Sequence, residues 1–127
     1  LPRLKTNFFD IINACVNKNL KYLNLEWLEE QSICIVLCSK GYPEKFKKNV
    51  EIKDLKKIEL KDTDFIFHAG TIIENEKIFS NGGRVLNFVA TSKDLKKSRQ
   101  KIIDTIKLLN WENGYFRKDI GFKIIDQ

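Results

Sequence analysis

The sequence passes from strand to helix in the stretch Gly82-Gly83-Arg84-Val85-Leu86-Asn87-Phe88-Val89-Ala90-Thr91-Ser92-Lys93-Asp94-Leu95. Residues 84–90 are mostly apolar, with aromatic and β-branched side chains that favour a strand. Thr91 and Asp94 then have the spacing of a capping box, a hydroxyl followed three residues later by a carboxylate. Apolar side chains continue at helical intervals, at Leu95, Ile102, Ile103, Ile106 and Leu109. The stretch therefore predicts a strand followed by an amphipathic helix.

Further strands are predicted upstream of this stretch. Residues 32–39 form a continuous apolar run of strand length, so we expect a strand buried on both faces. Residues 65–73 predict another strand, and residues 44–64 predict short, half-exposed strands joined by turns. Apolar side chains in residues 5–16 lie on one helical face, and a second helical piece is expected at residues 25–28, with Trp27 anchored in the core. This order predicts the α+β fold class, with the strands forming a small barrel or sandwich.

The composition favours a single modest core and an anionic partner. The chain has 127 residues, a formal charge of +6 and a pI near 9.2, which suits a nucleotide, a phosphorylated metabolite, a nucleic acid or a membrane surface. The lysines are spread along the chain and lie near acids, so we expect an ordinary solvated surface. This spread weakens the case for nucleic acid.

The cysteines and the apolar runs exclude several classes of protein. Cys15, Cys34 and Cys38 lie among apolar residues, where we expect buried free thiols, and with one histidine we expect no metal site. The longest apolar run, residues 33–38, is far shorter than the roughly 18 residues of a membrane span, so no membrane partner is predicted. The expected localisation is cytoplasmic, in a reducing compartment.

The Gly82-Gly83-Arg84 junction has two interpretations. Glycines allow close approach of the backbone to a phosphate and positive φ angles, and arginine offers a planar fork of donors, so the junction is a candidate anion site. The same pattern between apolar runs is typical of a tight hairpin, which is the commoner outcome.

Five phrases together resemble the C-terminal part of the phosphoribosylamine–glycine ligase family of the ATP-grasp superfamily. Their order and approximate spacing match that family over nearly the whole chain: Leu4-Lys5-Thr6, Gly41-Tyr42-Pro43, Phe67-His68-Ala69-Gly70-Thr71, Asn81-Gly82-Gly83-Arg84-Val85-Leu86 and Arg117-Lys118-Asp119-Ile120-Gly121. The departures are mild. Lys40 stands where a glycine commonly precedes Gly41, which questions whether that turn needs two glycines.

The resemblance implies a domain division and an activity. Residues 1–30 are expected to be the helical tail of an ATP-grasp region, and residues 31–127 a C-terminal hybrid-type domain. The family uses ATP to join phosphoribosylamine and glycine into glycinamide ribonucleotide, a step of purine biosynthesis that proceeds through a glycyl phosphate. The acidic and asparagine ligands that hold magnesium or manganese belong to a phrase that occurs nowhere in this sequence. We therefore expect the ATP and metal sites upstream of Leu1, no catalytic residue here, and no ligase activity of the isolated chain.

The resemblance also implies substrate-binding residues. Arg84, helped by the amides of Gly82 and Gly83, is expected to hold the 5′-phosphate of phosphoribosylamine, and His68 is a weaker candidate for a supporting donor. Arg117 and Asp119 are expected to tie the C-terminal tail to the domain. The other expected partners are glycine and the remaining ATP-grasp domains of the same enzyme.

Two alternatives come from other classes of protein. A small basic nucleic-acid-binding module would use exposed aromatics such as Phe65 and Phe67 on a sheet with basic neighbours. A non-catalytic remnant or separately encoded subunit would instead dock on a missing partner.

Overall fold

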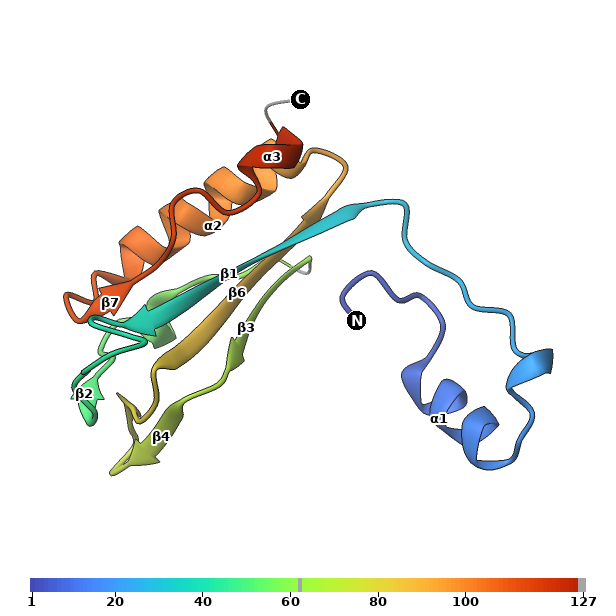
Figure 1. Cartoon of the computed structure of the whole chain (residues 1–127), viewed down its shortest axis with the longest axis horizontal. Helices are drawn as coiled ribbons and strands as arrows, with labels where there is room; N and C mark the ends of the chain where they lie inside the picture. The colour runs from blue at the N-terminus through green and yellow to red at the C-terminus, as the bar shows by residue number, and fades with distance from the viewer. Residues whose placement is uncertain (62, 126–127) are drawn as a thin grey trace.

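Two antiparallel sheets and the long helix α2 form the body of the protein, and a separate segment with helix α1 precedes them (Figure 1). The computed structural model describes residues 1–61 and 63–125. In chain order the elements are α1 (Phe8–Val16), the 3-10 helix η1 (Leu20–Tyr22), β1 (Gln31–Ser39), β2 (Val50–Glu51), the 3-10 helix η2 (Leu55–Lys57), β3 (Asp64–His68), β4 (Thr71–Glu74), β5 (Lys77–Ser80), β6 (Arg84–Ser92), α2 (Leu95–Leu109), β7 (Gly114–Tyr115) and α3 (Phe122–Ile125). The predicted α+β class is confirmed.

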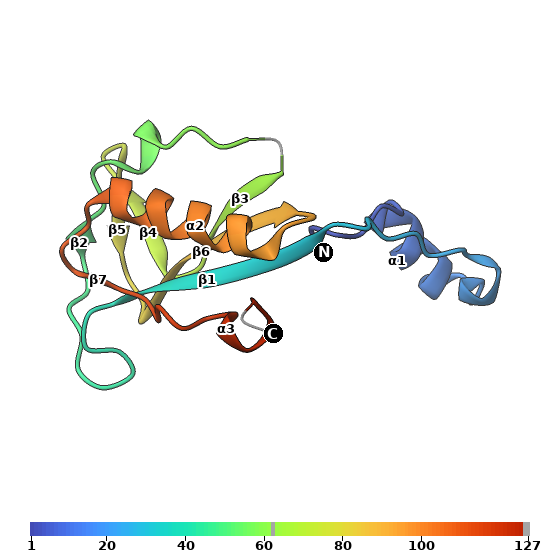
Figure 2. The ribbon, with the colours of Figure 1, turned by 90° about the horizontal axis from the view of Figure 1, so that it is seen from above.

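The larger sheet has the strand order β3-β6-β1-β7, and α2 packs across one of its faces (Figure 2). β1 and β6 pair in antiparallel register from Gln31 opposite Ser92 to Leu37 opposite Leu86. The core lies between this sheet and α2. Ile35 and Phe88 contribute to it from the strands, and Ile102 contributes to it from the helix. Phe88 lies near its centre, because β6 is flanked by strands on both sides.

The expectation that residues 32–39 are buried on both faces is wrong. Ile33, Ile35 and Leu37 are buried, whereas Cys34 between them is exposed. The reason is that α2 covers only one face of the sheet. The expectation of buried thiols fails as well, because Cys15 is also exposed and Cys38 is only partly buried.

The smaller sheet has the order β2-β5-β4. It includes the C-terminal end of the strand predicted for residues 65–73. Residues 65–73 do not form one strand: β3 ends at His68 in the larger sheet, and β4 begins at Thr71 in the smaller one. The break falls at Ala69-Gly70. In residues 44–61 the structure has the short strand β2 and the 3-10 helix η2, so only one of the short strands expected there is present.

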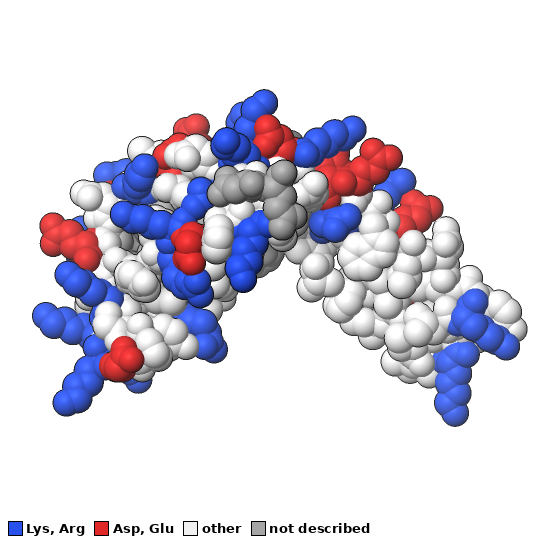
Figure 3. Space-filling model, turned by 45° about the horizontal axis from the view of Figure 1, so that its top comes forward, with Lys and Arg blue, Asp and Glu red and all other residues white. Residues whose placement is uncertain are grey.

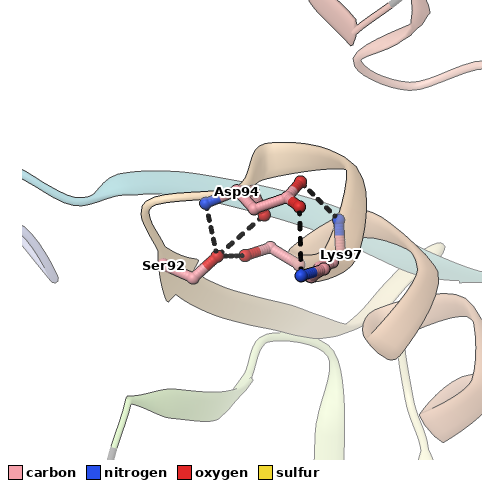
Figure 4. A network of polar contacts seen from close by, with 4 residues as sticks. Ser92, Asp94 and Lys97 are labelled. Atoms are coloured by element: carbon pink, nitrogen blue, oxygen red, sulfur yellow. Dashed lines mark hydrogen bonds and ion pairs between the residues drawn. The ribbon is translucent and has the colours of Figure 1, made fainter.

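The helix predicted after residues 84–94 is confirmed as α2, but its N-cap residue is not the predicted Thr91. The carboxylate of Asp94 accepts a hydrogen bond from the Lys97 N–H at 3.0 Å, and Ser92 Oγ accepts one from the Asp94 N–H at 3.1 Å (Figure 4). Ser92 Oγ also lies 2.6 Å from Ser98 Oγ. The predicted cap, Thr91, has a buried hydroxyl with no hydrogen-bond partner among the described residues. Asp94 is therefore the N-cap residue, and the capping-box assignment is wrong.

Replacing Asp94 with alanine is expected to lower Tm by about 3–6 °C, because the Lys97 N–H loses its acceptor. That hydrogen bond holds the pKa of Asp94 below its ordinary value of 3.8. A lowered folded-state pKa stabilises the protein above the unfolded-state pKa, and this stabilisation is lost as the pH falls through the folded-state value. Thermal melts from pH 7 to pH 3 should show the difference between parent and variant shrinking below pH 4. Asp94→Asn keeps an acceptor and should melt near the parent at pH 7; an alanine variant that melts with the parent would contradict the assignment.

Residues 1–30 lie apart from the body (Figures 1 and 2). The predicted helix is confirmed as α1, capped by Asn7, whose side chain accepts from the Phe9 N–H at 2.9 Å. The second predicted helix is wrong: residues 25–28 are not helical, and Trp27 pairs with Leu4 in an isolated bridge. Trp27 is 55% exposed, so it is not a core anchor, and α1 has no buried residue.

The charged surface agrees with the expectation of a solvated, lysine-rich exterior. Basic side chains cover much of the body, with acidic ones among them (Figure 3). On α2, Lys97 pairs with Asp94 at 3.6 Å and Lys107 with Asp104 at 3.4 Å, while Lys101 reaches Asp64 on β3. The first two pairs lie at the surface, where ion pairs neutralise charge locally and stabilise little, whereas Asp64 is buried. Within the described part of the chain, no helix is both long enough and apolar enough to span a membrane.

Candidate functional site

Gly82 and Gly83 connect the two sheets, so the hairpin interpretation of this junction is wrong. They follow β5, which pairs with β2 and β4, and precede β6, which pairs with β1 and β3. β5 and β6 are not paired with each other. The junction is therefore a crossing point, and it brings Arg84 to the start of a central strand.

The two glycines are needed for space rather than for positive φ. Among the described residues, the glycines with positive φ are Gly41 and Gly121. A Cβ on Gly83 would lie 2.0 Å from Cδ2 of Tyr42, and a Cβ on Gly82 would lie 3.0 Å from the Cα of Gly70. The expectation of positive φ at the junction is wrong. Protein atoms are the near neighbours of both glycines, and close approach to a phosphate stays a prediction.

Hydrogen bonds from both sides hold the junction in place. Ser39 donates through its Oγ to the Gly82 carbonyl at 2.9 Å and through its N–H to the Gly83 carbonyl at 2.8 Å. The Gly70 N–H donates to the Arg84 carbonyl at 2.9 Å. Ser39 and its neighbours come from β1, and Gly70 comes from the break between β3 and β4. These bonds engage carbonyl groups of the junction and leave the direction of the Arg84 side chain to other contacts.

Tyr42 sets the direction of the Arg84 side chain. The Arg84 Nη1 donates to the Tyr42 hydroxyl at 2.6 Å, and the guanidinium carbon lies 5.8 Å from the centre of the tyrosine ring. Arg84 is exposed, and none of the ion pairs between described residues involves it. A guanidinium has five N–H donors, so the hydroxyl engages a small part of its capacity. The geometry presents a positioned cation to solvent.

The turn before Tyr42 needs one glycine. Gly41 has a φ of 97°, and a Cβ there would lie 2.2 Å from the Lys45 carbonyl oxygen. Lys40 is not among the residues with positive φ, so a lysine fits at this position. The doubt raised by Lys40 is thereby resolved for this chain.

A cavity of about 390 Å³ opens beside Tyr42. Its walls are mostly apolar and come from β1, the loop after it and the C-terminal tail: Cys34, Val36, Cys38, Tyr42, Pro43, Tyr115, Phe116, Arg117 and Ile120. Burial raises the pKa of the Cys38 thiol, and the nearby positive charge of Arg84 opposes that rise. A larger hollow of about 890 Å³ lies between residues 40–54 and 109–113, and none of the predicted site residues lines it.

His68 lies next to the junction, and the two residues that follow it contact β6. Its Nδ1 lies 2.8 Å from Thr71 Oγ1, which is the contact of a satisfied surface side chain. Ala69 and Gly70, which follow it, bond to Val85 and Arg84 of β6. The structure thus places His68 at the end of β3 next to the junction, with its imidazole held by Thr71.

Arg117 and Asp119 pair with each other instead of tying the tail to the domain. The Arg117 Nε donates to Asp119 Oδ1 at 3.0 Å, and this pairing lowers the pKa of the Asp119 carboxyl. Arg99 of α2 holds the tail: its Nε donates to the Ile120 carbonyl at 2.8 Å, and its Nη2 to the Lys118 carbonyl. The predicted tether is therefore wrong, because the pair is local. Arg117 lines the same cavity as Tyr42, a position that spacing in the sequence did not indicate.

Four of the five phrases that carry the resemblance meet at one end of the body. Tyr42 bonds Arg84, Gly70 packs on Gly82, and Arg117 shares the cavity with Tyr42. The fifth phrase, residues 4–6, lies in the N-terminal segment. No group of three or more histidine, cysteine or acidic side chains that could hold a metal occurs among residues 1–61 and 63–125.

Comparisons with known proteins match almost the whole chain. The family model described as "Phosphoribosylglycinamide synthetase, C domain" matches residues 32–123. A phosphoribosylamine–glycine ligase from Caldanaerobacter subterraneus is 42% identical over 121 residues, which are 95% of this chain and 28% of that protein. The Brucella melitensis ligase is 35% identical over 127 residues, covering 100% of this chain and 30% of that protein.

A solved structure has the same fold. The crystal structure of phosphoribosylamine–glycine ligase from Thermotoga maritima matches with a TM-score of 0.61 and 26% identity, over 85% of this chain and 27% of that one. The chain therefore spans less than a third of the length of these relatives.

Proposed function

The chain belongs to the family of the phosphoribosylglycinamide synthetase C domain, and from this we propose that it acts as the C-terminal part of a phosphoribosylamine–glycine ligase. In that role it contributes to a ligase of purine biosynthesis, which joins phosphoribosylamine and glycine at the expense of ATP. The names and coverage of the relatives support the assignment. We further propose the division anticipated from the sequence, with residues 1–30 as the tail of the ATP-grasp region and residues 31–127 as the C-terminal domain.

Within this ligase we propose that Arg84 binds the 5′-phosphate of phosphoribosylamine. The supporting observation is a guanidinium at the junction of the two sheets, positioned by Tyr42 and without an ion pair among the described residues. A planar fork of donors matches two phosphate oxygens, and a fixed position avoids the cost of ordering the side chain on binding. The nearby amides of Gly82 and Gly83 and the imidazole of His68 are proposed as secondary contacts.

The chemical contribution of this site is positioning. Attack of the phosphoribosylamine amino group on an acyl phosphate needs the two reactants held at the right distance and the developing charge stabilised. Holding the phosphate at one end of the sugar fixes the amine at the other. Among residues 1–61 and 63–125 no group of three or more histidine, cysteine or acidic side chains could hold a metal, and we propose that the ATP and metal sites lie in the remaining ligase segments.

Replacing Arg84 with alanine in the intact ligase is expected to raise the Michaelis constant for phosphoribosylamine about 10- to 100-fold, the usual cost of a lost charge-assisted hydrogen bond. The Michaelis constant for ATP should stay the same, because ATP binds elsewhere. Steady-state assays of ADP release with each substrate varied in turn measure both constants.

Two further variants make the Arg84 assay specific. Arg84→Lys keeps the charge without the planar fork and should give an intermediate constant. His68→Asn tests the weaker candidate in the same assay, and an unchanged constant would remove His68 from the site. An unchanged constant for Arg84→Ala would overturn the phosphate assignment.

A further inference from the structure

The larger sheet has a second face that α2 does not cover. Side chains directly opposite each other in antiparallel strands lie on the same face. In one row Phe65, Val89 and Cys34 lie side by side, and in the next row the neighbours are Phe67, Asn87 and Val36. We call these six residues the open face.

The open face is apolar, uncharged and partly exposed. The side chains of Phe65 and Phe67 are 37% and 47% exposed, and their rings stack at 5.7 Å. Cys34 is exposed as well, Val36 and Asn87 are half-buried, and Val89 at the centre is buried. Contiguous apolar surface of this kind marks an interaction site. None of the six residues is basic, so the face lacks the charge that a nucleic-acid platform needs.

The strand that carries part of the open face directly follows the N-terminal segment. β1, which carries Cys34 and Val36, begins at Gln31, immediately after residues 1–30. In that segment α1 is mostly apolar and is uncovered too, with Phe9 at 70% exposure and no buried residue. A nine-residue helix has little stability alone in water. The chain therefore runs directly from one uncovered surface to the other.

We propose that the open face is the docking surface for the other domains of the ligase, which present an apolar surface to Phe65, Phe67 and Cys34. This inference rests on the proposed function. The relatives are more than three times as long as this chain, so they carry ample polypeptide to cover the face. Docking there places the partner beside the cavity next to Tyr42 and brings it toward Arg84, because Cys34 and Val36 belong to both the face and the cavity wall.

Cys34 reports on the docking. The rate of its alkylation by a maleimide, followed by peptide mass spectrometry, is compared in the 127-residue chain at low concentration and in the intact ligase that contains it. Thiol reactivity follows accessibility, so we expect alkylation at least about 10-fold slower in the intact ligase. Equal rates in the two proteins would overturn the proposal.

Two aspartate variants test the face itself. Phe67→Asp in the intact ligase should restore rapid alkylation of Cys34, because a charge at the interface disfavours docking. Leu108→Asp is the matched control: Leu108 is 75% exposed on α2, over the opposite face, and its variant should keep Cys34 protected. In the 127-residue chain Phe67→Asp should leave the far-UV circular dichroism spectrum unchanged, which shows that the domain still folds. Failure of Phe67→Asp to release Cys34 in a folded protein would overturn the proposal.

The remaining outcomes separate this inference from the proposed function. An intact ligase that releases ADP in response to glycine and phosphoribosylamine but leaves Cys34 reactive overturns docking alone. A protected Cys34 in a protein without that activity overturns the proposed function and supports docking. Protection of Cys34 in the 127-residue chain that rises with concentration, together with a dimer in sedimentation, would assign the face to a second copy and overturn the proposal.

Discussion

Replacing Phe88 with alanine is expected to lower the free energy of unfolding by about 3–5 kcal/mol, the usual cost of deleting a buried aromatic side chain. Phe88 is 2% exposed on the inner strand β6, where Ile35 of β1 and Ile66 of β3 lie opposite it. Because paired strands flank Phe88 on both sides, its neighbours cannot move into the space that the ring leaves. Since small domains are stable by roughly 5–15 kcal/mol, this loss removes a large share of the total stability.

Urea denaturation followed by far-UV circular dichroism measures this loss. Phe67→Ala is the matched control, because Phe67 is on the next strand of the same sheet but 47% exposed on the open face. It should cost less than about 1 kcal/mol in the 127-residue chain, as most surface substitutions do. Equal losses at the two positions would contradict the assignment of the core to the face under α2.

Replacing Gly70 with alanine is the second large expected effect, a loss of about 3 kcal/mol, at the upper end for overpacking. A Cβ on Gly70 would lie 2.5 Å from the Arg84 carbonyl oxygen and 2.8 Å from the Gly82 Cα. Both are backbone atoms at the crossing between the sheets, so the backbone itself must move. That movement also breaks the hydrogen bond from the Gly70 N–H to Arg84 and displaces the arginine.

Chemical denaturation of the isolated chain and the phosphoribosylamine Michaelis constant of the intact ligase measure the two consequences. Gly82→Ala is the matched control for stability, since its Cβ would lie 3.0 Å from the Gly70 Cα and 3.4 Å from the Arg84 carbonyl oxygen, a milder crowding than at Gly70. It should cost clearly less in stability. A neutral Gly70→Ala variant would show that the sheets are not held together at this point.

The helix over residues 95–109 was predictable because its signals are local. Apolar side chains recur at helical spacing, and a short polar stretch with capping residues precedes them. The identity of the cap was not predictable, because Thr91 and Asp94 both suit the position. The choice depends on where the strand β6 ends, and pairing with β1 extends that strand to Ser92.

The candidate site was only partly predictable. Arg84 and the two glycines were found from their chemistry and from a resemblance to a known family. Their contacts with Tyr42, Gly70 and Ser39 join residues from different strands and loops, and no local pattern indicates them. The role of the glycines was not predictable for the same reason, since the need for space at Gly83 comes from the ring of Tyr42 and that at Gly82 comes from Gly70.

By itself the sequence determined the α+β class, the helices α1 and α2, the family and the importance of the Gly82-Gly83-Arg84 junction, because these depend on periodicity and on residue types that are close in the chain. The tertiary structure alone decided that the strand of residues 65–73 divides between two sheets, that one face of the larger sheet stays open, and that Tyr42 positions Arg84. Burial and close packing depend on which distant segments meet. A run of apolar residues shows that a strand will be covered, but the packing of α2 decides on which side.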